Sequence, residues 1–314
     1  MECKNAIYVL ALTFLFSCNF QGDPHAKNGD TPTAGEISIA IDETFQPLME
    51  SEVFTFENLY TSASIHAHYT NEASAFQMLL ADSVRLIIAT RTLNAEEEAY
   101  FKKIKIFPRI TKVAIDALAL IANKNMPDSI ISTEQLSGIL KGEIKTWDQL
   151  QPQAGKEGIQ IVFDNKNSST ARYIMEKLNN SHAFPSNCYA LNSNKEVIDY
   201  VQKNKNTIGI IGLNWISDGD DPKSLGFLNQ IRVMSVSSKT TKALPNDAYA
   251  PYQAYIAQQF YPLTRDVYVI SREARAGLGT GFASFVAGDK GQRIVLKSGL
   301  LPATMPVRII GLSN

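Results

Sequence analysis

Apolar and polar positions along the chain predict strands and helices in alternation. Short runs of β-branched and apolar residues are followed by segments whose apolar residues recur every three or four positions. The predicted strands cover residues 36–41, 64–69, 84–90, 113–121, 159–163, 207–213 and 265–270. The predicted helices begin near residues 44, 71, 94, 132, 168 and 195, with a short one at 147–150 and a last one over 281–298. This alternation is typical of an α/β protein with parallel strands.

Several predicted helices carry polar residues at their first turn. Asn94 stands three residues before Glu97, which is the capping-box spacing, and Asn71 precedes the second helix. Free backbone N–H groups and the positive end of the helix dipole make such N-termini favourable places for an anion. In open α/β sheets, ligands bind beyond the carboxyl ends of strands, where these helix starts gather.

The first seventeen residues follow a different pattern. A short polar start containing Lys4 leads into an apolar run over residues 6–16, which is too short to span a bilayer and is typical of a secretory signal. Ser17 followed by Cys18 resembles the lipobox of bacterial lipoproteins, which implies that Cys18 becomes the lipidated first residue of an extracytoplasmic, membrane-anchored protein. An ordinary signal cleaved elsewhere is the alternative. Residues 18–34 lack periodicity and are predicted to be a flexible tether.

Composition narrows the function further. The chain has 314 residues, enough for two domains, and a net charge of -1, which argues against a nucleic-acid binder. Cys188 is the one cysteine after residue 18, so we expect no intramolecular disulfide and read it as a packed apolar residue. His66 and His68 share a strand face, but no third ligand is evident, so neither a metal nor a cofactor is expected.

Candidate chemistry gathers at the junctions between strands and helices. Hydroxyls can donate to oxyanion oxygens, and arginine can make charge-assisted contacts. The candidate ligand-binding residues are Thr44, Ser74, Thr90, Arg91, Ser168, Ser169, Thr170 and Arg172. Any one junction alone is read as a plain helix cap, so the prediction of a site depends on several junctions converging. No GxSxG, HExxH or Walker pattern occurs, and a hydrolase that uses Ser168 or His182 lacks a base beside the nucleophile, so we expect no enzyme.

Five segments resemble the PstS-like phosphate-binding proteins of bacterial ABC transporters. The matching segments are 113–123, 132–150, 207–212, 261–268 and 282–299. The resemblance implies a two-lobed type II periplasmic-binding-protein fold, with residues 35–114 plus 258–314 in one lobe and 115–257 in the other. It also implies a monomer that binds phosphate or a similar oxyanion and delivers it to the permease of an ABC importer. The alternative is the same fold with another small solute or a sensor role.

The resemblance carries over to the site only in part. Thr44, Ser74 and residues 168–170 match loops with which the family holds phosphate. Many members have an arginine four residues before the serine of the third loop, where this chain has Asp164. Arg172 or Arg91 is expected to supply the missing charge, and Asp42 to accept a proton from the ligand. Glu43 and Glu72 add negative charge near the same loops, which leaves the identity of the ligand open.

Overall fold

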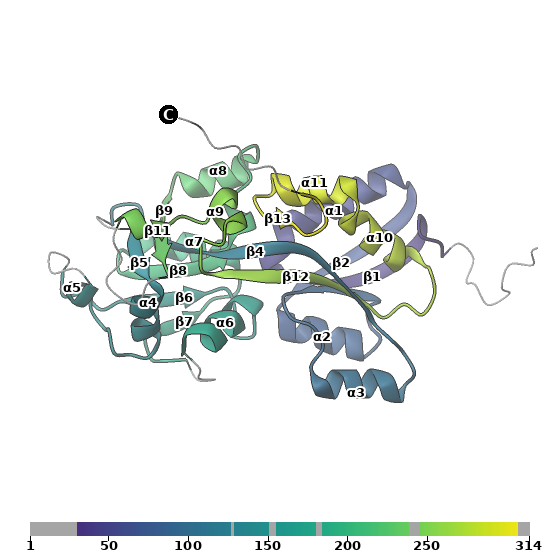
Figure 1. Ribbon diagram of the computed structural model, residues 1–314, viewed down its shortest axis with the longest axis horizontal. Helices are drawn as coiled ribbons and strands as arrows, with labels where there is room; N and C mark the ends of the chain where they lie inside the picture. Colours follow the sequence, from purple (N-terminus) through teal and green to yellow (C-terminus); the bar gives the residue numbers. More distant parts are fainter. Residues whose placement is uncertain (1–29, 127–128, 151–154, 180–183, 239–244, 307–314) are drawn as a thin grey trace, which may run out of the picture.

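The protein is described here by a computed structural model that covers residues 30–126, 129–150, 155–179, 184–238 and 245–306. The predicted signal, Cys18, most of the predicted tether and His182 lie outside these ranges. Two α/β lobes lie next to each other and are joined by long strands that run through both (Figure 1). The predicted two-lobed α/β architecture is confirmed. Within the described ranges, no helix has the length and apolar character needed to cross a membrane.

Strands and helices alternate over most of the chain. The strands are β1 (Ala34–Asp42), β2 (Ser62–Thr70), β3 (Leu86–Ala89), β4 (Arg109–Asn123), β5 (Ile130–Ser132), β6 (Gln160–Phe163), β7 (Cys188–Ala190), β8 (Thr207–Gly212), β9 (Ile231–Val233), β10 (Ser235–Ser237), β11 (Ala248–Tyr249), β12 (Thr264–Ser271) and β13 (Leu301–Pro302). The α-helices are α1 (Gln46–Leu59), α2 (Glu72–Leu80), α3 (Ala95–Lys103), α4 (Thr133–Leu140), α5 (Trp147–Leu150), α6 (Ser169–Ile174), α7 (Asn194–Lys203), α8 (Pro222–Leu228), α9 (Gln253–Ala257), α10 (Leu278–Ala287) and α11 (Asp289–Lys297). Short turns of other helix types are η1 (Glu43–Phe45), η2 (Met175–Asn179), η3 (Leu213–Trp215) and η4 (Pro245–Asp247).

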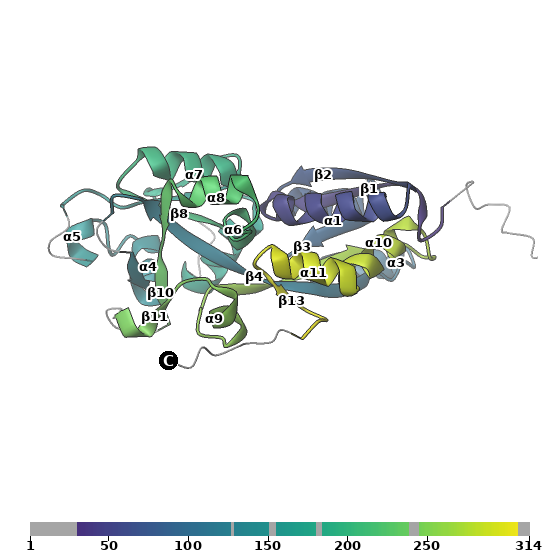
Figure 2. The same cartoon turned by 90° about the horizontal axis from the view of Figure 1, so that it is seen from above.

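Ten strands from the two lobes form one hydrogen-bonded sheet in the order β2-β1-β3-β12-β4-β8-β6-β7, with β9 and β13 also paired to β4. β5, β10 and β11 form a separate three-stranded sheet in the order β11-β10-β5. β1 runs parallel to β2 and β3, and β6 runs parallel to β7 and β8. β12 is antiparallel to its neighbours β3 and β4. The first part of β4 pairs with β12 and its last part with β8 and β9, so this strand passes from one lobe into the other (Figure 2).

Each lobe has its own hydrophobic core. We call lobe I the part built from β1–β3, α1–α3, α10 and α11, and lobe II the part built from β5–β11 and α4–α9. Successive residues of a strand point to opposite faces, so in lobe I Ile39 packs with Phe56 and Phe282, while its neighbour Ala40 packs with Phe76 on the other face. The lobe II core surrounds Ile161 and its neighbours on β6 and β8. The sheet of each lobe is therefore covered on both faces, as parallel strands require.

The prediction of one last helix over residues 281–298 is wrong. Gly288 has an extended backbone, with φ -85° and ψ 173°, and it separates α10 from α11. Asp289 then places a carboxylate in the first turn of α11, which favours a helix start at that point. The Gly288-Asp289 pair is the sequence feature that indicates a break between two helices at this position. The strand predicted over 113–121 is longer in the structure, where β4 begins at Arg109 and ends at Asn123.

Residues 30–34, which fall within the predicted tether, contact the start of α10. The Leu278 backbone N–H donates to Asp30 Oδ1 over 2.9 Å, and Thr31 forms a β-bridge with Ala34. A Cβ atom on Gly281 would lie 1.8 Å from the carbonyl oxygen of Pro32, so only glycine allows this approach. The chain is thus attached to lobe I from Asp30 onward.

Candidate oxyanion site between the lobes

The candidate site forms where the corner between β1 and α1 meets two helix starts of lobe II. Asp42 ends β1, and its Oδ1 accepts the Thr44 backbone N–H over 2.9 Å, which turns the chain into η1. Across the lobe boundary, Ser168 caps α6 and Ser193 caps α7. The corner of lobe I therefore faces the backbone N–H groups in the first turns of two lobe II helices.

Six residues from both lobes make direct contacts at this point. We call Asp42, Thr44, Asp164, Ser168, Ser169 and Thr170 the interlobe cluster. Asp42 Oδ2 accepts the Ser169 backbone N–H over 3.2 Å. The Thr44 hydroxyl donates to Asp164 Oδ2 over 3.3 Å and lies 3.5 Å from the Thr170 hydroxyl. Every member is at most 1% exposed, so these polar groups are shielded from bulk water.

Asp164 follows β6 and is held by hydroxyl and amide donors. Its Oδ1 accepts the Ser168 hydroxyl over 2.6 Å, and Asn194 Nδ2 lies 3.4 Å from its Oδ2. Burial, and next the charge of Asp42, raise the pKa of the Asp164 carboxyl to about 7. A carboxyl with this pKa exchanges its proton in the physiological range, and can accept or donate a hydrogen bond to a ligand.

Asp42 and its neighbour Glu43 occupy two different helix starts. The Glu43 carboxylate accepts both the backbone N–H and the side-chain amide of Asn194, the latter over 2.7 Å, at the beginning of α7. Burial raises the pKa of Glu43 to about 7. Burial and the charge of Glu72 raise the pKa of Asp42, while the charge of Arg265 opposes this shift. Two carboxylates of lobe I thus lie where lobe II favours negative charge.

Arg265 is a cation that contacts the interlobe cluster through Ser169, and it is absent from the residues predicted from sequence. Its Nη1 donates to the Ser169 hydroxyl over 3.0 Å, and its Nε donates to Asp116 Oδ2 over 2.9 Å. Arg265 and Asp116 face each other in the ladder between β12 and β4. Arg265 Nη2 is buried without a hydrogen-bond partner among the described residues. The sequence signal for this pair is a charged residue at a buried position of each strand, Asp116 in β4 and Arg265 in β12.

Thr90 and Arg172 lie in a neighbouring group around Glu72. The Glu72 carboxylate accepts the Thr90 hydroxyl over 2.9 Å and Arg172 Nε over 2.7 Å, and Arg172 Nη2 donates to the Thr90 hydroxyl over 2.8 Å. Burial alone would raise the pKa of Glu72, but the charge of Arg172 and the donated hydrogen bonds hold it below its usual range. Arg172 also pairs with Glu176. This group joins α2 of lobe I to α6 of lobe II, and its single arginine is shared between two carboxylates.

Two predicted site residues have other contacts. Arg91 makes a two-pronged ion pair with Glu97 over 2.7 and 2.8 Å, and its guanidinium lies 3.4 Å from the ring centroid of Phe76. The Ser74 backbone N–H donates to Asn71 in the first turn of α2. The structure therefore brings Thr44 together with residues 168–170 and places Thr90 and Arg172 in a neighbouring group. The two arginines expected to face the ligand, Arg91 and Arg172, are both paired with carboxylates.

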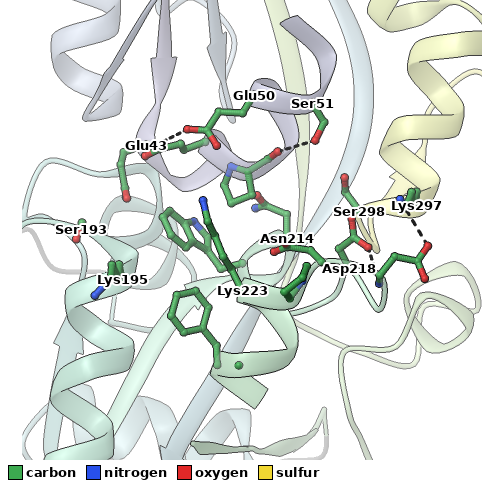
Figure 3. A pocket seen from close by; sticks show the side chains of 18 of the residues that line it. Glu43, Glu50, Ser51, Ser193, Lys195, Asn214, Asp218, Lys223, Lys297 and Ser298 are labelled. Carbon is green, nitrogen blue, oxygen red and sulfur yellow. Dashed lines mark hydrogen bonds and ion pairs between the residues drawn. The ribbon is translucent and has the colours of Figure 1, made fainter. Parts of the chain in front are cut away.

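A groove of about 1100 Å³ lies beside the interlobe cluster. The exposed face of α1 forms one wall, and η3, the start of α7 and α8 form the other. Figure 3 shows Glu43 of η1 and Glu50 of α1 on one side of the groove, and Lys195 and Lys223 on the other. Asn214 contributes to the groove and donates to the Thr44 backbone oxygen over 2.8 Å. The groove thus borders the loop that carries Thr44.

A family model described as the PBP superfamily domain matches residues 26–290. The chain belongs to the PBP superfamily. Curated relatives of this PBP superfamily member include the phosphate-binding protein PstS of Borreliella burgdorferi, 23% identical over 94% of this chain and 96% of that protein. The PstS of Staphylococcus saprophyticus is 23% identical over 90% of this chain and 84% of its own length.

Solved structures of similar proteins support the same fold. A Clostridium perfringens protein crystallised with bound phosphate has a TM-score of 0.72 and 21% identity, covering 86% of this chain and 100% of that one. An ABC-type phosphate transport receptor from Vibrio cholerae has a TM-score of 0.63 and 18% identity, with coverage of 86% and 100%. This PBP superfamily member therefore has the predicted two-lobed fold and is PstS-like in sequence.

Proposed function

We propose that the protein binds inorganic phosphate, or a closely similar oxyanion, between its two lobes and does not alter it chemically. The convergence of four hydroxyl-bearing residues at the start of α6 carries this proposal: Thr44, Ser168, Ser169 and Thr170. Hydroxyl groups and a helix N-terminus are donors that suit a tetrahedral anion. A ligand seated there takes the place of the direct Thr44 contacts to Asp164 and Thr170.

Arg265 supports the same proposal through charge. Its guanidinium contacts Ser169 and keeps one buried N–H group without a partner among the described residues, so it offers a charge-assisted bond close to the hydroxyls. Arg172 and Arg91, which the sequence suggested for this role, are engaged with Glu72 and Glu97. We therefore propose that Arg265 provides the positive charge that position 164 lacks.

The proposed role is that of a receptor for an ABC importer outside the cytoplasm. The phosphate-binding names of the relatives and the membership of the PBP superfamily support it. We propose that residues 35–114 with 258–314 and residues 115–257 close on the ligand as two bodies. Lipidation at Cys18 would keep a monomer of this kind within reach of the permease.

Removing two hydroxyls of the interlobe cluster is expected to weaken phosphate binding strongly. Each hydrogen bond to a charged ligand contributes about 1.5–3 kcal/mol, so Ser168→Ala with Thr170→Ala should lower the affinity roughly 100-fold or more, measured by isothermal titration calorimetry. The matched control is Thr55→Ala with Ser284→Ala, since both hydroxyls donate to carbonyls of their own helices, away from the interlobe cluster. An unchanged affinity in the first variant would refute this site.

A further inference from the structure

Two carboxylates, one from each lobe, face the position that we propose for the oxyanion. Asp42 reaches it from β1, and Asp164 reaches it from the end of β6. Thr44 connects them, because its backbone N–H donates to Asp42 over 2.9 Å and its hydroxyl donates to Asp164 over 3.3 Å. Asp42 is fully buried and Asp164 is 1% exposed, so solvent does not screen their charges.

The charged groups around these carboxylates leave the site with an excess of acid. Those that face it are Glu43 from η1, Glu72 from α2, Asp116 from β4, Arg172 from α6 and Arg265 from β12. Arg172 is shared between Glu72 and Glu176, and Arg265 is shared between Asp116 and Ser169. An oxyanion that carried its full charge would therefore meet more repulsion than attraction.

Resting on the proposed function, we propose that Asp164 acts with Asp42 as a specificity determinant that restricts the site to oxyanions with protons on two of their oxygens. A carboxylate oxygen and an unprotonated anion oxygen repel each other, whereas one proton between them makes a strong hydrogen bond. Monobasic phosphate carries two such protons, dibasic phosphate carries one, and sulfate carries none. Monobasic phosphate is thus the form that satisfies both carboxylates.

The proton count of the complex gives the expected pH dependence. Dibasic phosphate and two carboxylates together hold one proton, whereas the complex needs two, so binding above neutral pH takes up one proton. In the complex, that proton lies on the ligand oxygen that faces the Asp164 carboxylate, where it makes a charge-assisted hydrogen bond. The bound form is therefore favoured at low pH and disfavoured as pH rises. Linkage then predicts roughly a tenfold loss of affinity per pH unit above neutral.

The first test is phosphate titration by calorimetry at about pH 6, 7 and 8 with wild-type protein, Asp164→Asn and Asp289→Asn. The amide that replaces the Asp164 carboxyl still accepts from Ser168 and can donate to an unprotonated anion oxygen. This variant should therefore lose most of the pH dependence and bind phosphate roughly tenfold more tightly at about pH 8 than wild type does. Asp289 lies on α11 and pairs with Arg293, so its variant should behave as wild type. Melting curves identify any variant that is not folded. The dependence of phosphate affinity on pH in wild-type protein tests the proposal without relying on any variant.

The second test varies the number of ligand protons at about pH 6. Wild-type protein should prefer phosphate over methylphosphonate, which carries one acidic proton as a monoanion, and over sulfate by roughly tenfold or more at each step. Asp164→Asn should narrow both gaps. Phosphate binding with no pH slope in wild type, or an identical slope in Asp164→Asn, would overturn the role of Asp164 while leaving the proposed function intact. Absence of phosphate binding by wild type at every pH would overturn the proposed function itself.

Discussion

Replacing Arg265 with methionine is expected to destabilise the protein by about 3–5 kcal/mol, because it leaves a buried carboxylate without its counter-charge. Asp116 is fully buried and has its Oδ2 2.9 Å from Arg265 Nε. Burial already raises the pKa of Asp116, and the charge and hydrogen bond of Arg265 are the main opposing influences. The loss should appear as a lower midpoint in urea unfolding at neutral pH. It should shrink in acid, where Asp116 can take up a proton.

A double-mutant cycle separates the structural role of Arg265 from its proposed role in binding. Asp116→Leu combined with Arg265→Met replaces the ion pair by apolar side chains and should recover most of the lost stability. Phosphate affinity should stay at least roughly tenfold below wild type in the double variant, because the cation beside Ser169 is gone. Additive losses of stability would contradict the coupling of the pair. Restored affinity would contradict contact between Arg265 and the ligand.

Replacing Glu52 with methionine is expected to stabilise the protein by about 2–3 kcal/mol at neutral pH. Glu52 shares the inner face of α1 with Leu48 and Phe56, is fully buried, and has no hydrogen-bond partner for either oxygen among the described residues. Burial raises the pKa of Glu52 to about 9. The buried carboxyl is therefore neutral in the folded state at pH 7 but charged in the unfolded chain, which favours unfolding.

The sign of this effect sets its pH window. A carboxyl whose pKa is raised on folding costs nothing below its ordinary pKa, and its cost grows as pH rises from about 4.5 towards about 9. The gain from Glu52→Met, measured by urea unfolding at several pH values, should be small in acid and grow towards alkaline pH. Glu50→Gln on the exposed face of the same helix is the matched control. A gain that did not vary with pH would contradict a neutral Glu52.

Local patterns were sufficient to predict the framework of lobe I and the elements β6, β8 and α4–α7 of lobe II, but not α8 or α9. The capping box of Asn94 and Glu97 is present, and strands such as β1, β2, β3 and β8 lie where alternation or apolar runs placed them. Elements of two or three residues, such as β9 and β13, were not predicted, because such short runs have no measurable hydrophobic period. They pair with β4, so long-range contacts rather than local preference decide them.

The hydroxyl donors of the candidate site could be predicted from sequence, whereas the arrangement of its charged side chains could not. Thr44 lies in the turn after β1, and Ser168, which follows β6, caps the helix that begins with Ser169 and Thr170, so local sequence marks them. Arg265 lies inside an apolar strand, and its place beside Ser169 depends on the pairing of β12 with β4, which is distant in the chain. Arg172 and Glu72 likewise meet only through tertiary contacts. Which arginine faces a ligand is decided by the partners that the fold brings to each one.

The contacts of β12, α10 and α11 with the first part of lobe I have a consequence for how the chain becomes folded. β12 is hydrogen-bonded to β3, and Phe282 and Phe285 pack on Phe56, although more than two hundred residues separate these rings in the chain. During synthesis or export, the first part of lobe I must wait with its apolar faces exposed until the last segment arrives. Lobe II, whose core lies mostly within one continuous stretch, can form earlier. Until α10 and α11 pack on the first part of lobe I, its apolar faces stay exposed. A chain that is slow to finish, or that lacks these helices, is therefore most prone to aggregation at this stage.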